Sequence, residues 1–234
     1  MTLAIFSIDA IEEELYEIVK NEDLFKNALQ PSTKWTIRLK RYFFEKFNSC
    51  DELIWMFSPE SWTRFGLMFP EHEKLVRREF LIDIISLEKT NMKFALGVEI
   101  EWMTHAAKNQ KPEEQRKFDL MREFLEKVYI LKFDANEHNK IIDCLFDFSK
   151  LVHVNPNYRI MICAPKNEEE QAKLLEYFTQ IINSHPKEQT VIDKFLLVFL
   201  SRISKGNPLY FKTYKLELNN DKFKLIIKRC ELIT

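Results

Sequence analysis

Three acidic side chains on two neighbouring apolar segments have the types and spacing to act together. Asp83 is the one acid in the run FLIDIISL (residues 80–87), and Glu99 and Glu101 lie in FALGVEIEW (residues 94–102). A buried ionised carboxylate is costly unless it is paired, hydrogen-bonded or bound to metal. Two carboxylates two residues apart on a strand share a face, about 7 Å apart. Such a group could hold a hard cation such as Mg²⁺, which activates water for attack on a phosphodiester.

The second segment has the alternation of a strand with one buried face. Its apolar residues occupy every second position: Phe94, Leu96, Val98, Ile100 and Trp102. A period of two is typical of a strand. We expect residues 80–87 and 93–103 to form an antiparallel hairpin across the polar connection 88–92, which brings Asp83 beside Glu99. Gly97, on the same face as Glu99, is expected to leave space for a substrate backbone.

Solvent exposure is the alternative interpretation of the two glutamates. Acids on the polar face of an amphipathic strand commonly face water, so Glu99 and Glu101 could be ordinary surface residues. Asp83 is harder to explain in this way because its segment is apolar on both faces. The spacing alone therefore leaves both interpretations open.

Residues 81–102 resemble the catalytic hairpin of the PD-(D/E)XK nuclease superfamily, which has the restriction-endonuclease-like fold. Ile82-Asp83 resembles the first element of that motif, without its proline. Glu99-Ile100-Glu101 resembles the second, with Glu in place of Lys, as in the BamHI-type restriction endonucleases. The expected helix and strand at residues 147–164 are similar to the layout that follows the hairpin in this fold. The resemblance covers about residues 80–183.

The resemblance implies an α/β protein with a restriction-endonuclease-like mixed β-sheet flanked by helices. It implies a metal-dependent endonuclease that hydrolyses phosphodiester bonds of DNA in restriction or defence, with RNA left open as a substrate. Asp83 and Glu99 would bind Mg²⁺, for which Mn²⁺ could substitute, and Glu101 would orient or deprotonate the attacking water. Glu79 and Glu73 are candidates for an additional acid.

Two other functions remain open at this point. A nuclease-fold protein without catalysis could bind nucleic acid or a protein partner, and Glu101 in the lysine position is compatible with that loss. A structural or interaction protein could instead use the charged segment 108–132 as its working surface. If the protein is an active nuclease, cleavage of both DNA strands favours a homodimer.

The chain of 234 residues is long enough for one sizeable core, and its 46% hydrophobic and 30% charged residues are typical of a folded globular protein. We predict one nuclease-like domain over residues 1–234. It divides into an N-terminal helical and aromatic region (1–70), a catalytic core (80–183) with a charged helical insertion (108–137), and C-terminal strands (190–234). Residues 35–47 fit a helix or a strand equally well.

Periodicity and turn residues predict the remaining elements. Helices are expected at residues 8–29, 108–132, 137–152 and 168–183. Strands are expected at residues 158–164, 209–218 and 223–230, with a turn at residues 219–221, and a strand or buried segment at 191–203.

Charge and cysteine content exclude little. The 35 basic and 36 acidic residues neither require nor exclude a nucleic-acid partner. Basic residues near aromatic ones could contact phosphates, although a solvated face is the alternative: Arg38, Lys40, Arg41, Arg77 and Arg78. The 4 cysteines lack the close spacing of a zinc knuckle. With no signal peptide and no membrane-spanning run evident, we expect a cytoplasmic protein with reduced thiols and no membrane partner.

Overall fold

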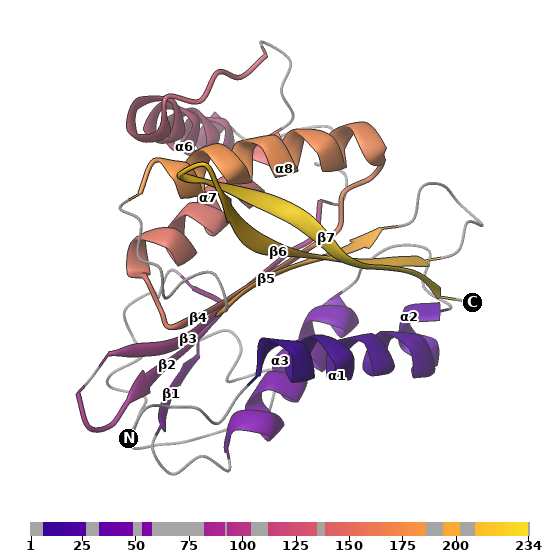
Figure 1. Cartoon of the computed structure of the whole chain (residues 1–234). Coiled ribbons are helices and arrows are strands. Elements are labelled where there is room, and N and C mark those ends of the chain that lie inside the picture. Colours follow the sequence, from indigo (N-terminus) through magenta and orange to yellow (C-terminus); the bar gives the residue numbers. More distant parts are fainter. Residues whose placement is uncertain are drawn as a thin grey trace.

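The computed structural model describes residues 7–26, 33–48, 53–57, 82–91, 93–103, 112–134, 139–185, 194–201 and 209–233. Seven described strands form one mixed sheet in the order β1-β2-β3-β4-β5-β6-β7. The N-terminal helices α1, α2 and α3 lie on one face of this sheet, and α6, α7 and α8 lie on the other (Figure 1). The chain is therefore of the α/β class, with a mixed sheet flanked by helices, as the sequence predicts.

The bounds of the elements follow, first for the helices and then for the strands. The helices are α1 (Ile8–Asn21), α2 (Asp23–Lys26), α3 (Thr33–Asn48), α6 (Pro112–Tyr129), α7 (Asn139–Val154) and α8 (Glu168–Asn183). The strands are β1 (Leu53–Phe57), β2 (Ile84–Glu88), β3 (Phe94–Glu101), β4 (Tyr158–Cys163), β5 (Phe195–Ser201), β6 (Leu209–Asn219) and β7 (Lys222–Ile233).

The expected hairpin is present. Strand β2 pairs antiparallel with β3, and Ile84 lies opposite Val98. Strand β3 then pairs in parallel with β4, after a crossover that contains α6 and α7, and β4 pairs in parallel with β5 through α8. Because parallel neighbours end at the same edge of a sheet, the ends of β3, β4 and β5 share one edge.

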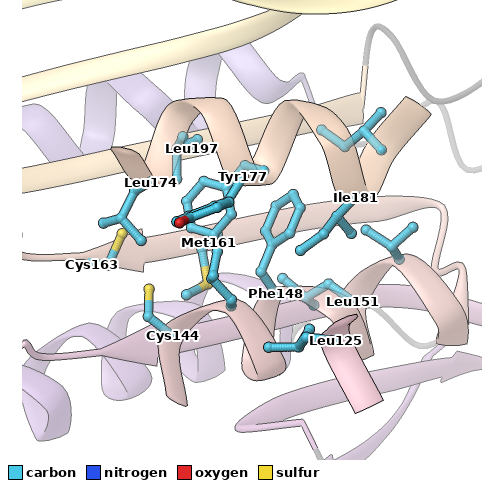
Figure 2. Close-up of a cluster of buried hydrophobic side chains, with 14 of the residues drawn as sticks. Leu125, Cys144, Phe148, Leu151, Met161, Cys163, Leu174, Tyr177, Ile181 and Leu197 are labelled. Atoms are coloured by element: carbon cyan, nitrogen blue, oxygen red, sulfur yellow. The ribbon is translucent and has the colours of Figure 1, made fainter. Parts of the chain in front are cut away.

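Each face of the sheet has its own hydrophobic cluster. Residues Leu96, Val98 and Ile100 of β3 pack under the N-terminal helices, beside Trp35 and Leu39 of α3. On the opposite face, side chains of α6, α7, β4 and α8 meet in one cluster, in which Cys144 of α7 lies near Cys163 of β4 (Figure 2). Both cysteines are buried and carry free thiols. A strand covered on both faces becomes uniformly apolar, which explains β5 (FLLVFLS).

Local signals explain where several elements begin and turn. Ser7 caps α1 by accepting a hydrogen bond from Asp9 N, and Asn167 caps α8 by accepting one from Glu170 N. Strands β6 and β7 join through Asn220 (φ 47°) and Asp221 (φ 60°). Positive φ at both central residues is typical of a type I′ hairpin turn, and Asn and Asp tolerate it at low cost.

Several sequence expectations are settled here. Residues 35–47 are helical, as part of α3, and the strand option for them is wrong. Strand β1 was not expected at all, and it pairs with β2 at one edge of the sheet. The charged segment 108–132 contains α6, whose Phe118, Met121 and Leu125 are buried against α7. Within the described parts of the chain, no helix is long and apolar enough to cross a membrane.

Candidate active site at the head of the hairpin

Asp83 and Glu99 are in direct contact. Asp83 N donates a hydrogen bond to Glu99 Oε2 at 3.2 Å, and Ile100 N donates one to Asp83 Oδ2 at 3.0 Å. Asp83 was expected inside a strand, but β2 begins one residue later, at Ile84. The hairpin still places Asp83 beside Glu99 because Ile84 lies opposite Val98. The two residues are therefore neighbours, and each carboxylate accepts a hydrogen bond from a backbone N–H of the facing segment.

The pleat of β3 turns both glutamates toward α7. Glu99 is only 2% exposed and Glu101 is half-buried, so the solvent-facing interpretation is wrong for Glu99. The expectation for Gly97 is also wrong. A Cβ atom there would lie 2.8 Å from Pro156 Cγ and 3.0 Å from Leu151 Cδ2. Gly97 thus makes room for α7 and for Pro156, which follows that helix, rather than for a substrate.

One face of α7 carries a row of four charged side chains above these glutamates. Lys140, Asp143, Asp147 and Lys150 are separated by three, four and three residues, which places them on the same side of a helix. Lys150 Nζ lies 3.0 Å from Glu99 Oε1 and 2.5 Å from Asp147 Oδ1. Lys140 Nζ lies 3.5 Å from Glu101 Oε1 and 3.2 Å from Asp143 Oδ2.

A third lysine reaches the site from the opposite face of the sheet. Lys40 of α3 is buried, and its Nζ lies 2.5 Å from Asp83 Oδ1. Lys40 was predicted to contact phosphates from the surface. In the structure it forms an ion pair inside the site instead.

Carboxylates outnumber ammonium groups in this cluster. The described members are five acids (Asp83, Glu99, Glu101, Asp143 and Asp147) and three lysines (Lys40, Lys140 and Lys150). Burial, followed by the charge of Asp147, raises the pKa of Glu99 well above its usual range. The same two causes raise the pKa of Glu101 to about 8. Burial raises the pKa of Asp147 to about 6, against the opposing effect of Lys150. The three lysines are thus too few to neutralise all five acids if every carboxyl group is ionised.

The donor atoms suit a hard divalent cation, although no complete cage is formed. Lys150 Nζ lies 3.0 Å from Glu99 Oε1, but that buried oxygen accepts no hydrogen bond from the described residues. No group of three or more His, Cys, Asp or Glu side chains in the described ranges gathers closely enough to hold a metal ion. Mg²⁺ is commonly held by one or two carboxylates, with water and substrate phosphate completing its shell. Asp83 and Glu99 supply two neighbouring carboxylates, although both oxygens of Asp83 already have partners in Lys40 Nζ and Ile100 N.

The other predicted site residues do not join the cluster. Glu73, Glu79, Arg77 and Arg78 lie outside the described residues. Arg38 is paired with Glu22, with 2.5 Å between Arg38 Nη2 and Glu22 Oε1. Arg41 is exposed and paired with Glu45 four residues further along α3.

Sequence reasoning missed the charged row on α7, although a signal for it was present. Residues 140–150 read KIIDCLFDFSK, in which the four charges have helical spacing among apolar residues. An apolar helix whose few charges share one face indicates a buried polar contact rather than a solvated surface. Comparisons with known proteins add no further assignment, since no protein-family model, curated protein or solved structure matches the chain.

Proposed function

We propose that the protein is a metal-dependent nuclease that hydrolyses phosphodiester bonds, with DNA as its substrate and a role in restriction or defence. The observation that carries this proposal is the contact of Asp83 with Glu99 at the open end of an antiparallel hairpin. These two residues belong to a cluster that has more carboxylates than lysines. The order of hairpin, helix α7 and strand β4 supports it, because it agrees with the restriction-endonuclease-like layout that the sequence resembles.

Asp83 and Glu99 would hold the divalent cation, with Mg²⁺ as the expected ion and Mn²⁺ as a substitute. When bound, the ion would lower the pKa of a coordinated water and neutralise charge on the phosphate. Glu101 lies one pleat beyond Glu99 on the same face, where it can orient the attacking water or take its proton. Glu101 cannot supply the positive charge of the lysine it replaces. Lys150, which already lies 3.0 Å from Glu99, can supply it to a phosphate that enters the site.

Cleavage assays with matched variants test the proposal. The wild-type protein should cut duplex DNA in Mg²⁺ or Mn²⁺ and be inactive in a chelator. Asp83→Asn and Glu99→Gln should each lower the rate by about 100-fold or more, as expected when charge stabilisation in the transition state is lost. Glu88→Gln is the control, because Glu88 ends the same strand β2 and hydrogen-bonds Asn91 and Asn157, far along the hairpin from Asp83. Cleavage that survives both site variants would contradict the proposal.

A nuclease-fold protein that binds without cutting is the second candidate. The observation that favours it is the pairing of Asp83 with Lys40 and of Glu99 with Lys150, which already neutralises part of the proposed metal site. Single-stranded DNA and RNA should therefore be included in the assays, together with a binding measurement for each nucleic acid. Retention of one of them without any cleavage would support this second function.

A further inference from the structure

Lys150 has two carboxylate partners, and only one of them belongs to the proposed metal site. Its Nζ lies 3.0 Å from Glu99 Oε1 on β3 and 2.5 Å from Asp147 Oδ1 on α7 itself. The pair with Asp147 joins residues three apart on one helix, so it does not depend on how α7 sits against β3. The pair with Glu99 crosses from helix to strand. Lys150 therefore keeps a local partner if Glu99 is taken from it.

Glu99 is the less satisfied member of the contact. Its Oε2 accepts a hydrogen bond from Asp83 N, whereas its Oε1 lies 3.0 Å from Lys150 Nζ and accepts no hydrogen bond from the described residues. A divalent cation on Glu99 Oε1 would take the place of that ammonium, since two positive groups cannot share one oxygen at contact distance without strong repulsion. The lysine ammonium sits on a flexible stem of four methylene groups, so it can move without any shift of the backbone.

We propose that Lys150 is a resident counter-cation that a divalent metal ion displaces from Glu99, and that Asp147 holds the displaced ammonium beside the site. Lys150 then has two successive roles. It neutralises Glu99 in the metal-free protein, and it offers its ammonium to substrate phosphate once the metal is bound. The inference rests on the proposed function, because the competing ion is the Mg²⁺ of that proposal.

Metal binding without nucleic acid distinguishes this inference from its alternatives. Calorimetric titration with Mg²⁺ and with Mn²⁺ measures affinity in the absence of any cleavage. Lys150→Met removes the competitor and should bind either ion at least about tenfold more tightly than wild type, because Glu99 and Asp147 then lack an ammonium. Lys150→Arg keeps the charge and should bind as wild type does. Lys127→Met is the matched control, because Lys127 pairs with Glu123 on the exposed face of α6.

The outcomes separate the inference from the function on which it rests. If wild type binds metal and Lys150→Met binds it no more tightly, the exchange is overturned and the nuclease proposal stands. If Lys150→Met binds metal and wild type does not, the metal does not displace Lys150 in the native chain, and both the exchange and metal-dependent cleavage are overturned. If neither protein binds metal, both proposals are overturned. Lys150→Gln, which keeps a donor of similar length, replaces the Met variant should that one fail to fold.

Discussion

Two glutamates, Glu12 on α1 and Glu99 on β3, are each 2% exposed, yet their surroundings differ in charge. Glu12 is contacted by two cations from β7: Lys228 at Oε2 and Arg229 Nε at 3.6 Å from Oε1. Thr213 of β6 donates a further hydrogen bond to Oε1. Glu99 shares a single lysine with Asp147 and has Asp83 as a neighbour. Glu12 contacts two cations, which also pair with the exposed acids Asp9 and Glu13, while Glu99 contacts one cation and lies among further partly buried acids.

This difference separates a structural ion pair from a candidate site. A buried charge that serves only the fold is expected to have its hydrogen bonds and opposite charges complete, as they are around Glu12. Incomplete neutralisation of buried acids is costly to the fold and is concentrated at functional sites. Four changes to the protein, in order of decreasing expected effect, test whether the surroundings of the two glutamates differ in this way.

Removal of Glu12 should have the largest effect on stability. Glu12→Ala leaves Lys228 and Arg229 without their buried partner, and such losses cost about 3–5 kcal/mol. Urea unfolding measures the change in the free energy of unfolding. Glu17→Ala is the control, since Glu17 is exposed on the same helix and its ion pair with Lys20 is also exposed. Equal effects of the two variants would show that Glu12 contributes no more than a surface ion pair.

A methyl group at position 97 should push α7 away from β3. Gly97→Ala places a Cβ atom 2.8 Å from Pro156 Cγ and 3.0 Å from Leu151 Cδ2, so the stiff ring of Pro156 must move away from β3. Overpacking of this kind costs about 1–3 kcal/mol. We expect a matching loss in the free energy of unfolding, and weaker cleavage because α7 carries Lys150. Wild-type stability together with wild-type cleavage would refute the role of Gly97 in placing the helix.

Stability in a chelating buffer should fall as the pH rises toward 8. The pKa of Glu101 is raised from 4.5 to about 8, so between these values the unfolded chain releases a proton that the folded protein retains. Each such group lowers the free energy of unfolding by up to about 1.4 kcal/mol per pH unit in that window. The groups that face Glu101 from α7 are Lys140, Asp143 and Asp147. Urea unfolding across pH 5–8 should show a shallower slope for Glu101→Gln than for wild type, and identical slopes would contradict the prediction.

Neutralisation of Glu99 should have the smallest effect on stability. Glu99→Gln removes a buried charge that burial already disfavours, as the raised pKa of Glu99 shows, and Lys150 keeps its contact with Asp147. The free energy of unfolding at pH 7 in a chelator should therefore change by less than about 1 kcal/mol. A loss as large as that of Glu12→Ala would mean that Glu99, too, is a structural ion pair.

Local patterns in the sequence were sufficient for the elements around the site. The alternation in β3, the helical period of α8 at residues 168–183 and the turn at Asn220 and Asp221 all predicted what is observed. The short connection in the β2–β3 hairpin predicted that Asp83 meets Glu99. Each of these signals depends on neighbours in the sequence, or on strands joined by a few residues.

The parts that were missed depend on distant contacts. Alternation in β3 shows that Gly97 and Glu99 share a face, but not that α7, some 50 residues later, covers it. The aromatic residues of α3 fit a helix or a strand until the sheet face that buries Trp35 is known. Lys40 looked like a surface cation because nothing near it in the sequence indicates that Asp83, 43 residues away, is its partner.

The order of the seven described strands has a consequence for folding during synthesis of the chain. Each strand lies beside the strand that precedes it in the sequence, so a sheet edge is already available for every new strand as the ribosome releases it. The contacts of Glu12 depart from this order, because Lys228 follows Glu12 by 216 residues. A nascent chain in which β7 has not yet been synthesised can contain every other described strand. It still lacks Lys228 and Arg229, the two cations that contact Glu12. The first described helix therefore completes its contacts only when the last strand has been made.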